Sequence, residues 1–379
     1  MRRLVLVVLL FATLVTWAAL RLLQRELPHF ADAPDARAVG SFHVHSDMSH
    51  DGRVPVADIA HAAARAGLDF VVLTDHNAQL PTATQVDGIT VVSSAELSTP
   101  YGHVIALGGK TLLGKAARER RNVLDAIRED GGRPILAHPA DVKRPWAGPV
   151  GGAAGLEVAN LAASARRHRA HLFLDLLPLL IAAPLRPDLA LAQLYDRDRR
   201  ALSRWDEETD PRVVGLCGND AHGWLDMGLN MSAWLTVLDE PLPPEQDARP
   251  QAIVAALTQG RSSCVAGMLG RAAGLTFVAR AAGATVARAG ESVEVTSVEA
   301  LDVVVPAVIG ARARLVLLRN GAELLETARS ELHYVGPLSG TYRVEVRVPV
   351  PGLWWGESAV TAMYSNRIRI LAARAETSP

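Results

Sequence analysis

Seven short apolar segments recur between residues 39 and 217 of this 379-residue chain, with helical or irregular stretches between them. Short apolar strands that alternate with helices are typical of a parallel sheet, either open or closed into a barrel. Seven strands within about 180 residues suit a barrel. The predicted strands are 39–45, 70–74, 89–94, 104–107, 134–137, 156–158 and 213–217, and the predicted helices include 56–66 and 115–129.

Imidazole and carboxylate side chains lie at the ends of these predicted strands. His43 and His45 end the first strand, and they can bind one ion together because residues i and i+2 of a strand face the same side. A barrel places its active site at the strand ends, so the whole set is expected to meet there. One His-x-His pair is weak evidence of a site, whereas five strand-end groups are strong evidence. The others are His76, Glu96, His138, and the pair Asp220 and His222, with His103 just before the fourth strand.

The same residues, in the same order, resemble the polymerase and histidinol phosphatase (PHP) domain over about residues 40–268. The motifs are His-x-His at 43–45, Ser-x-Asp-Gly at 49–52, Thr-Asp-His at 74–76, His-Pro at 138–139 and Asp-x-His at 220–222. The resemblance implies a distorted (β/α)7 TIM-like barrel. It also implies nine metal ligands, all present here: His43, His45, Asp51, His76, Glu96, His103, His138, Asp220 and His222.

The resemblance further implies a cluster of up to three metal ions, two of which share Glu96. We assign catalytic roles to Glu96, Asp220 and His222. Asp75 is expected to orient a neighbouring ligand, with a turn or capping carboxylate as the alternative. The implied subsites are His43, His45 and Asp220 with Glu96; His103 and His138 with Glu96; and Asp51, His76 and His222.

The chemistry of this ligand set follows from its residue types. Six imidazoles and three carboxylates without a thiolate suit two to three divalent ions, and Zn, Mn and Fe all accept such ligands. Two ions that share a carboxylate can lower the pKa of a water and orient the resulting hydroxide for in-line attack. The same ions stabilise charge on phosphoryl oxygens. We therefore expect a metal-dependent phosphoesterase that acts on a phosphomonoester or a phosphodiester.

Two other functions stay open. A similar site can activate water against an amide or a lactone, and a barrel without catalysis can serve as a binding or scaffold protein of the cell envelope. By resemblance, the expected substrate is a phosphorylated small molecule, a nucleotide or a nucleic-acid end. A net charge of −1 argues against a stable nucleic-acid partner held by bulk positive charge.

Three basic residues on loops beside the motifs are candidates for holding a substrate phosphate. Arg53 follows Asp51, and Lys143 and Arg144 follow His138. The alternative for each of them is a charged side chain of a loop that is solvated and has no role in binding.

The amino-terminal segment is apolar from residue 4 to residue 20, after Arg2 and Arg3. Seventeen residues rise about 25 Å as a helix, just enough to cross a thin bilayer core. We expect a single-pass anchor in the cytoplasmic membrane with the body facing outward, and a cleaved signal that releases a secreted protein is the alternative. A buried helix of the body is the third interpretation.

The rest of the chain divides into further segments. Residues 1–39 form the anchor or signal and a linker, and residues 40–268 form the barrel with a helical insertion at about 164–208. The apolar stretch 172–181 of the insertion either packs on the barrel or meets a membrane or partner. Residues 269–379 are expected to form an all-β sandwich, and a disulfide between Cys217 and Cys264 is conceivable outside the cytoplasm. Its predicted strands are 275–279, 293–298, 302–305, 314–318, 342–348 and 368–371.

Overall fold

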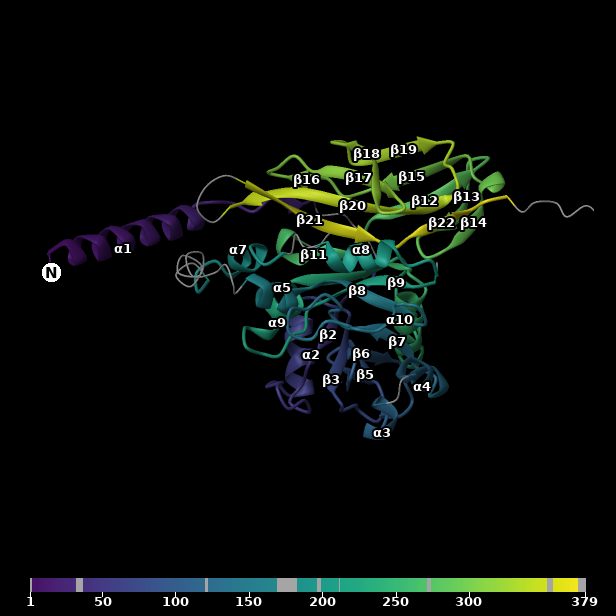
Figure 1. The fold of residues 1–379 in the computed structure, drawn as a ribbon, viewed down its shortest axis with the longest axis horizontal. Coiled ribbons are helices and arrows are strands. Elements are labelled where there is room, and N and C mark those ends of the chain that lie inside the picture. The colour runs from purple at the N-terminus through teal and green to yellow at the C-terminus, as the bar shows by residue number, and fades with distance from the viewer. Residues whose placement is uncertain are drawn as a thin grey trace, which may run out of the picture.

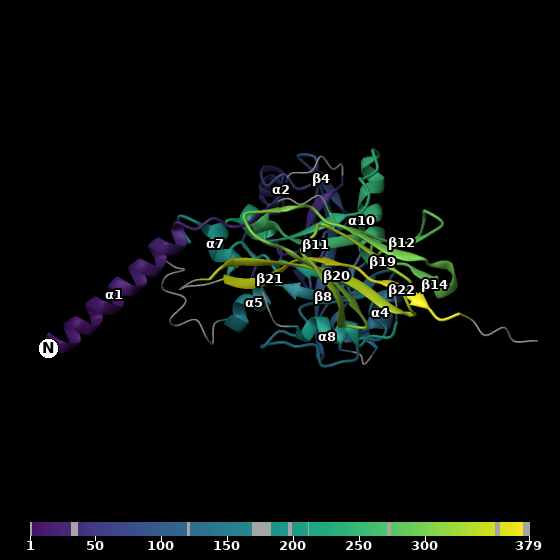
Figure 2. The ribbon, with the colours of Figure 1, turned by 90° about the horizontal axis from the view of Figure 1, so that it is seen from above.

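The computed structural model describes residues 2–31, 37–119, 122–168, 183–195, 199–210, 212–270, 274–352 and 357–373. Helix α1 (Arg2–Leu23) projects away from the body of the molecule, as both ribbon views show (Figures 1 and 2). Residues Arg3–Leu23 have a mean hydropathy of 2.3 and are long and apolar enough to cross a membrane, which is also true of a signal sequence. At the end of α1, Leu22 is buried in a small cluster with Leu189, and Arg186 donates a hydrogen bond to the Arg25 carbonyl at 3.2 Å.

All seven strands predicted between residues 39 and 217 are present, although their bounds differ by a few residues. They pair in the order β2-β3-β5-β6-β7-β8-β9. Hydrogen bonds from His45 N–H to the Ala221 carbonyl (2.8 Å) and from Asn219 N–H to the Phe42 carbonyl (3.0 Å) join the end of β9 to β2. The strands are β2 (Val39–Val44), β3 (Phe70–His76), β5 (Ile89–Thr99), β6 (Gly102–Leu107), β7 (Arg133–Leu136), β8 (Gly155–Asn160) and β9 (Val214–Gly218), with β4 (Thr84–Val86) beside β5.

The apolar runs reflect burial on both faces of these strands. In β3, Val71 and Leu73 enter one hydrophobic cluster with Ile59, whereas Phe70 and Val72 enter another with Ile253. Ile59 and Ile253 belong to two helices that cover the sheet. The helices of this part of the chain are α2 (Val56–Arg65), α3 (Lys115–Arg118), α4 (Val123–Glu129), α5 (Leu161–His168), α7 (Pro187–Ala192), α8 (Arg200–Asp206), α9 (Met227–Met231) and α10 (Arg249–Thr258).

The expectation of a parallel sheet is wrong at β6, which runs antiparallel to both β5 and β7. Only Pro100 and Tyr101 separate β5 from β6, and a crossover to a parallel strand needs a dozen residues or more. The helix expected at 115–129 is also divided, into α3 and α4. The insertion is helical in its described parts, and its apolar stretch 172–181 lies outside the described residues.

The carboxyl-terminal part is rich in β-structure. One sheet has the order β13-β12-β15-β19, and β14, β22, β20, β21, β17 and β18 extend the sheet of the amino-terminal part. Both sheets contribute to one hydrophobic cluster, with Leu301 from β15 and Val344 from β20. The strands are β12 (Thr276–Ala281), β13 (Ala284–Arg288), β14 (Ser292–Glu294), β15 (Ala300–Val304), β17 (Arg314–Arg319), β18 (Ala322–Thr327), β19 (Glu331–Val335), β20 (Gly340–Pro351), β21 (Glu357–Ser365) and β22 (Ile368–Leu371), and a separate pair is β1 (His29–Phe30) and β16 (Val308–Ile309).

The strands that join the two parts are β10 (Trp234–Leu238) and β11 (Ser262–Ala266), which the sequence analysis did not identify. β10 pairs with β2, and β11 pairs with β10 on one side and β21 on the other. One sheet therefore continues across residue 268, the expected domain boundary, and the division itself stays a prediction. A disulfide between Cys217 of β9 and Cys264 of β11 links the same region. The strand expected at 293–298 ends at Glu294, where a 3-10 helix (Val295–Ser297) begins.

Candidate metal centre

Three candidate ligands adopt a backbone conformation that side chains with a Cβ rarely adopt. The φ angles are 68° at His43, 29° at His138 and 52° at Asp220. His43 lies where the pairing of β2 with β3 shifts register between Phe42 and Val44, so it lies in a bulge rather than in regular strand. Strain of this kind persists only where the surrounding structure imposes it, and it gathers at functional sites.

Four buried side chains form the first group, from β2 and the residue directly after it, from β5 and from the segment after β9. The Nε2 atoms of His43 and His45 lie 3.1 Å apart, and each lies 3.4 Å from Glu96 Oε2. Asp220 Oδ1 lies 3.5 Å from the first nitrogen and 3.4 Å from the second. Tetrahedral ligands with bonds of about 2.0–2.2 Å are separated by about 3.4 Å, so this spacing fits a metal ion.

Glu96 also faces a second group through its other oxygen. Its Oε1 lies 2.9 Å from His103 Nδ1 and 3.0 Å from His138 Nε2. Its Oε2, which faces His43 and His45, also lies 3.2 Å from His76 Nδ1. A carboxylate that directs its two oxygens to different sets of imidazoles has the arrangement that a ligand bridging two ions requires.

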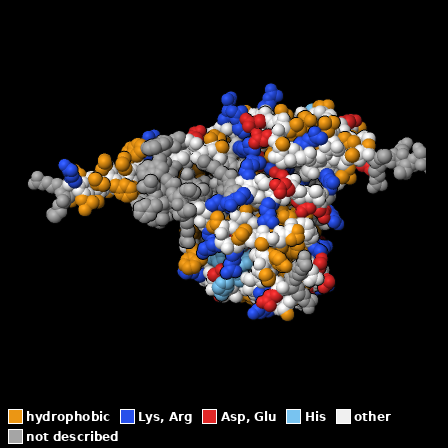
Figure 3. All heavy atoms as spheres, in the orientation of Figure 1, with side chains coloured by type: hydrophobic (Ala, Val, Ile, Leu, Met, Phe, Trp, Pro, Cys, Tyr) orange, Lys and Arg blue, Asp and Glu red, His pale blue; other side chains and the backbone are white. Residues whose placement is uncertain are grey.

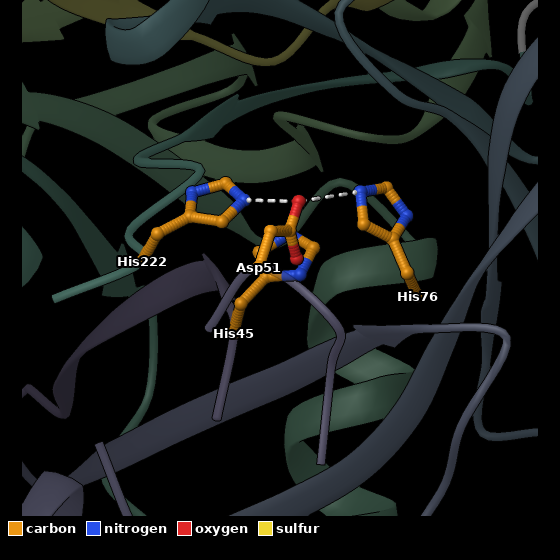
Figure 4. A group of neighbouring side chains, drawn as sticks. All are labelled: His45, Asp51, His76 and His222. Atoms are coloured by element: carbon orange, nitrogen blue, oxygen red, sulfur yellow. Dashed lines mark hydrogen bonds and ion pairs between the residues drawn. The ribbon is translucent and has the colours of Figure 1, made fainter. Parts of the chain in front are cut away.

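The third group surrounds Asp51, on the more exposed side of the site. Asp51 Oδ2 lies 3.3 Å from His76 Nε2 and 3.2 Å from His222 Nε2, and these two imidazoles flank it (Figure 4). The rings of His222 and His45 stack with centroids 4.2 Å apart, which connects this group to the first. Its residues come from the loop after β2, the end of β3 and the segment after β9. The structure thus brings all nine sequence-predicted ligands into one cluster.

Glu157 of β8 is a residue that the sequence analysis missed. Its Oε1 lies 2.7 Å from His43 Nδ1, and its Oε2 accepts hydrogen bonds from the His138 backbone N–H (2.6 Å) and from Asn160 Nδ2 (2.8 Å). A Cβ on Gly218 would lie 1.8 Å from Glu157 Oε1, so the carboxylate needs glycine at that position. The only feature of the sequence that could have identified Glu157 is its position as a single carboxylate within an apolar predicted strand.

Asp75 lies beside the cluster and does not enter it. It accepts hydrogen bonds from the Ser46 backbone N–H (2.6 Å) and from Ser46 Oγ (2.8 Å). These bonds hold the loop directly after His45, in keeping with the orienting role considered for this carboxylate.

Arg166 of α5 is the second residue that the sequence analysis missed. Its Nη2 donates to Asp220 Oδ2 at 3.0 Å, and its Nε donates to Asp141 Oδ2 at 2.6 Å. Arg166 is partly exposed, so its guanidinium contacts the buried ligand Asp220 from the solvent-accessible side of the site. An arginine in a predicted helical insertion, far from the motifs, carried no signal in the sequence.

The three sequence-predicted basic residues are all exposed. Arg144 is the closest to the ligands, with its Nη1 3.5 Å from His103 Nε2. The Arg53 guanidinium carbon lies 3.2 Å from the centroid of the Trp224 ring. Lys143 donates its backbone N–H to Asp141, at 2.6 Å, and its side chain is solvated.

Burial and charge perturb the titration of the cluster. Burial by itself raises the pKa of Glu96, yet His43, His103 and His138 bring that pKa well below its usual range. Burial also lowers the pKa of His43, but Glu157, Glu96 and Asp220 raise it well above its usual value. For His45 burial prevails, and its pKa is lowered to about 4. Positive charge close to Glu96 therefore favours its ionised form in spite of burial.

Two features show that these residues fit metal ions. His76 Nδ1, Glu96 Oε2 and His138 Nδ1 are buried and have no hydrogen-bond partner among the described residues. Buried polar atoms of this kind are uncommon and call for an explanation such as an ion. The donor set itself, of imidazole and carboxylate without thiolate, suits Zn, Mn or Fe.

Residues 41–131 match the model of the PHP domain. This segment carries six of the nine candidate ligands, from His43 to His103. A structure from Bacteroides vulgatus, described as a two-domain protein containing a predicted PHP-like metal-dependent phosphoesterase, is similar over 89% of this chain and 99% of its own, with 16% identity and a TM-score of 0.37. Among curated proteins, none matches this sequence.

Proposed function

We propose that this chain is a metal-dependent phosphoesterase that hydrolyses a phosphomonoester or a phosphodiester. The observation that carries this proposal is Glu96, whose two oxygens face two different sets of imidazole nitrogens in one buried space. The PHP domain match over residues 41–131 supports it. A phosphorylated small molecule, a nucleotide or a nucleic-acid end is the proposed substrate.

Two to three divalent ions, of Zn, Mn or Fe, are the proposed cofactors. When bound, they supply a water of lowered pKa and positive charge against the phosphoryl oxygens. Three sets of residues, whose interatomic distances are given above, are proposed to hold the ions. They are His43, His45, Glu96 and Asp220; Glu96, His103 and His138; and Asp51, His76 and His222.

The chain's own residues orient these ligands and hold the substrate. Because a carboxylate only accepts hydrogen bonds, His43 Nδ1 donates to Glu157, and Nε2 is the nitrogen that would bind a metal ion when it gives up its proton. Arg166 and Arg144 are proposed to contact the substrate phosphoryl group, since each lies against a candidate ligand from the partly exposed side. Arg53 and Lys143 are proposed to bind it further from the ligands.

We also propose that strands β2, β3 and β5 to β9 form a distorted (β/α)7 barrel. We further propose that α1 is a membrane anchor with the body outside the cytoplasm. The hydrogen bonds between β9 and β2 support the first of these proposals. The Cys217–Cys264 disulfide supports the second, because disulfides persist in oxidising compartments.

The experiment that tests the function combines metal analysis with a substrate panel. Full-length protein is purified without chelator, its metal content per chain is measured, and hydrolysis of phosphomonoesters, phosphodiesters, amides and lactones is compared. Glu96→Ala is expected to lose both metal and phosphoester hydrolysis, whereas Glu331→Gln, an exposed carboxylate on β19, is the matched control.

The other functions are outcomes of the same experiment. Less than about one metal ion per chain, or unaltered activity in Glu96→Ala, contradicts the proposal. Release of carboxylate from amides or lactones without release of phosphate identifies a different hydrolase. Metal binding without hydrolysis of any substrate in the panel favours a binding or scaffold protein.

A further inference from the structure

Three loops that carry candidate ligands continue directly into exposed apolar side chains. Met48 follows His45 and is 40% exposed, and Val142 follows His138 and is 52% exposed. Trp224 and Leu225 follow His222 and are 65% and 51% exposed. Single exposed apolar residues are common on protein surfaces, but these lie at the ends of the loops that form one site. We call these four residues the apolar rim.

The loops that carry the rim contact residues of the metal centre. The loop with Met48 lies against the loop with Trp224, since Asp51 contacts His222 and Arg53 stacks on the Trp224 ring. Val142 belongs to the opposite loop, whose Arg144 approaches His103. The loops that carry the rim residues therefore approach the ligand cluster at two places, near His222 and near His103.

Basic side chains accompany the apolar ones beside the metal centre. They are Arg53, Lys143 and Arg144, which are exposed, and Arg166, which is partly exposed. Tryptophan together with arginine and lysine is the composition that favours the interface between lipid tails and headgroups. Anionic headgroups add electrostatic attraction to such a surface.

The position of helix α1 determines which side of the body would face a membrane. The end of α1 is attached to the body through Leu22 and Leu189, and Leu185, two residues before α7, is 69% exposed. Figure 3 shows the pale-blue imidazoles on the lower left of the body, the side from which α1 projects. A bilayer crossed by α1 would therefore lie on the same side of the body as the metal centre.

We infer that the apolar rim rests on the bilayer that α1 crosses, and that the site acts on a phosphoester carried by a lipid headgroup. The substrate class rests on the proposed function, whereas the docking of the rim does not. A headgroup phosphate would reach the ligands between the rim residues, with the lipid tails still in the bilayer. Arg144 and Arg166 would contact that phosphate, and Arg53 and Lys143, which lie further from the ligands, would also contact neighbouring anionic headgroups.

The first test compares a lipid with its water-soluble equivalent. Full-length, metal-loaded protein in nanodiscs is offered phosphatidic acid in the bilayer or glycerol 3-phosphate in solution, and phosphate release is measured. Phosphatidylglycerol and glycerophosphoglycerol serve as the corresponding diesters. We expect Trp224→Ser/Leu225→Ser to lower the ratio of lipid to soluble turnover about tenfold, because two apolar side chains no longer enter the bilayer. The matched control is Val335→Ser on β19, also exposed, which should leave this ratio unchanged.

The second test does not depend on activity. Amide hydrogen exchange of residues 46–54 and 222–226 is compared between protein in nanodiscs and protein in detergent micelles. Slower exchange in nanodiscs, lost in Trp224→Ser/Leu225→Ser and kept in Val335→Ser, supports the docking. Equal exchange in the two preparations overturns it.

The two tests also separate the inference from the proposed function. Hydrolysis of the soluble phosphoesters with none of the lipids overturns the lipid substrate and leaves the phosphoesterase in place. If no phosphoester is hydrolysed, the phosphoesterase and the lipid substrate are both overturned, and hydrogen exchange alone decides the docking.

Discussion

His43 and Glu157 are joined by a hydrogen bond of 2.7 Å between Nδ1 and Oε1 in the buried interior of the molecule. The bond turns the opposite nitrogen of His43 toward His45, Glu96 and Asp220. Glu157 also accepts the backbone N–H of His138, so one carboxylate positions candidate ligands from two strands. Such outer carboxylates fix the tautomer and the ring orientation of ligating histidines.

Replacing Glu157 should therefore weaken metal binding without removing a ligand. We expect Glu157→Ala to lower metal affinity by roughly 10–100-fold, as measured by competition with a chromophoric chelator. Glu157→Gln should have a smaller effect, because its amide oxygen still accepts from His43 Nδ1. Equal affinity in Glu157→Ala and the unmodified protein would show that the bond to His43 does not orient it.

Arg166 should affect turnover more than metal content. It donates to Asp220 Oδ2 and is open to solvent, so Arg166→Ala removes a charge-assisted contact to the proposed phosphoryl site. A loss of about 10–100-fold in kcat/KM is expected, equivalent to roughly 1.5–3 kcal/mol. Arg65→Ala, an exposed arginine of α2, is the control, and metal content is measured for both. A proportional loss of bound metal in Arg166→Ala would instead indicate that Arg166 acts by holding Asp220.

The disulfide should contribute substantially to stability. Cys217 and Cys264 are separated by 47 residues and join β9 to β11. A loop of this length corresponds to about 4 kcal/mol of unfolding free energy in the chain-entropy model. Cys217→Ala/Cys264→Ala should lower the unfolding free energy by a comparable amount in urea denaturation. A change below about 1 kcal/mol would show that the bond adds little to the pairing already present in the sheet.

Glu345 should make stability depend on acid pH. Its carboxylate accepts hydrogen bonds from Arg343 (2.6 Å), Arg199 (2.8 Å) and Arg347 (2.7 Å). Burial raises its pKa, but Arg343 and Arg199 prevail and lower it to about 2, from 4.5. A carboxylate with a lowered pKa stabilises the fold above its unfolded-state pKa, and that stabilisation is lost as the pH falls toward 2.

The change that checks this is Glu345→Gln. At pH 7 it should lower the unfolding free energy by about 3 kcal/mol or more, which follows from the pKa difference and from the buried charge left on Arg343. The difference from the unmodified protein should shrink as the pH falls from about 4.5 to 2. Glu323→Gln is the control, because this carboxylate is exposed and contacts Arg347 at the edge of the network. A difference that stays constant over this pH range would contradict the assigned pKa.

The parts of the fold that could be predicted are those encoded locally. An apolar run such as 70–74 indicates burial on both faces of a strand, so all seven strands from β2 to β9 in the pairing order were identified from the sequence. Most candidate ligands were equally visible, because histidine and carboxylate residues directly after apolar runs depart from the pattern around them. His103 precedes a predicted strand instead, and Asp51 was identified only by the resemblance to the PHP domain. Their roles as ligands stay predictions.

The parts that could not be predicted depend on contacts between distant segments. Pairing of β11 with β21 joins residues about one hundred positions apart, and no local pattern specifies it. Glu157 and Arg166 acquire their meaning only when β8 and α5 are placed beside His43 and Asp220. The reversed direction of β6 was locally readable in principle, since the turn after Thr99 is too short for a crossover.

The sequence by itself determined which residues can enter a metal centre and which segments are buried, because both properties depend on residue type and on near neighbours. Only the tertiary structure decided which imidazoles face each oxygen of Glu96, which carboxylate orients His43 and that the two cysteines meet. These relations are distances between strands, and a chain acquires them only when its hydrophobic burial has placed the strands side by side.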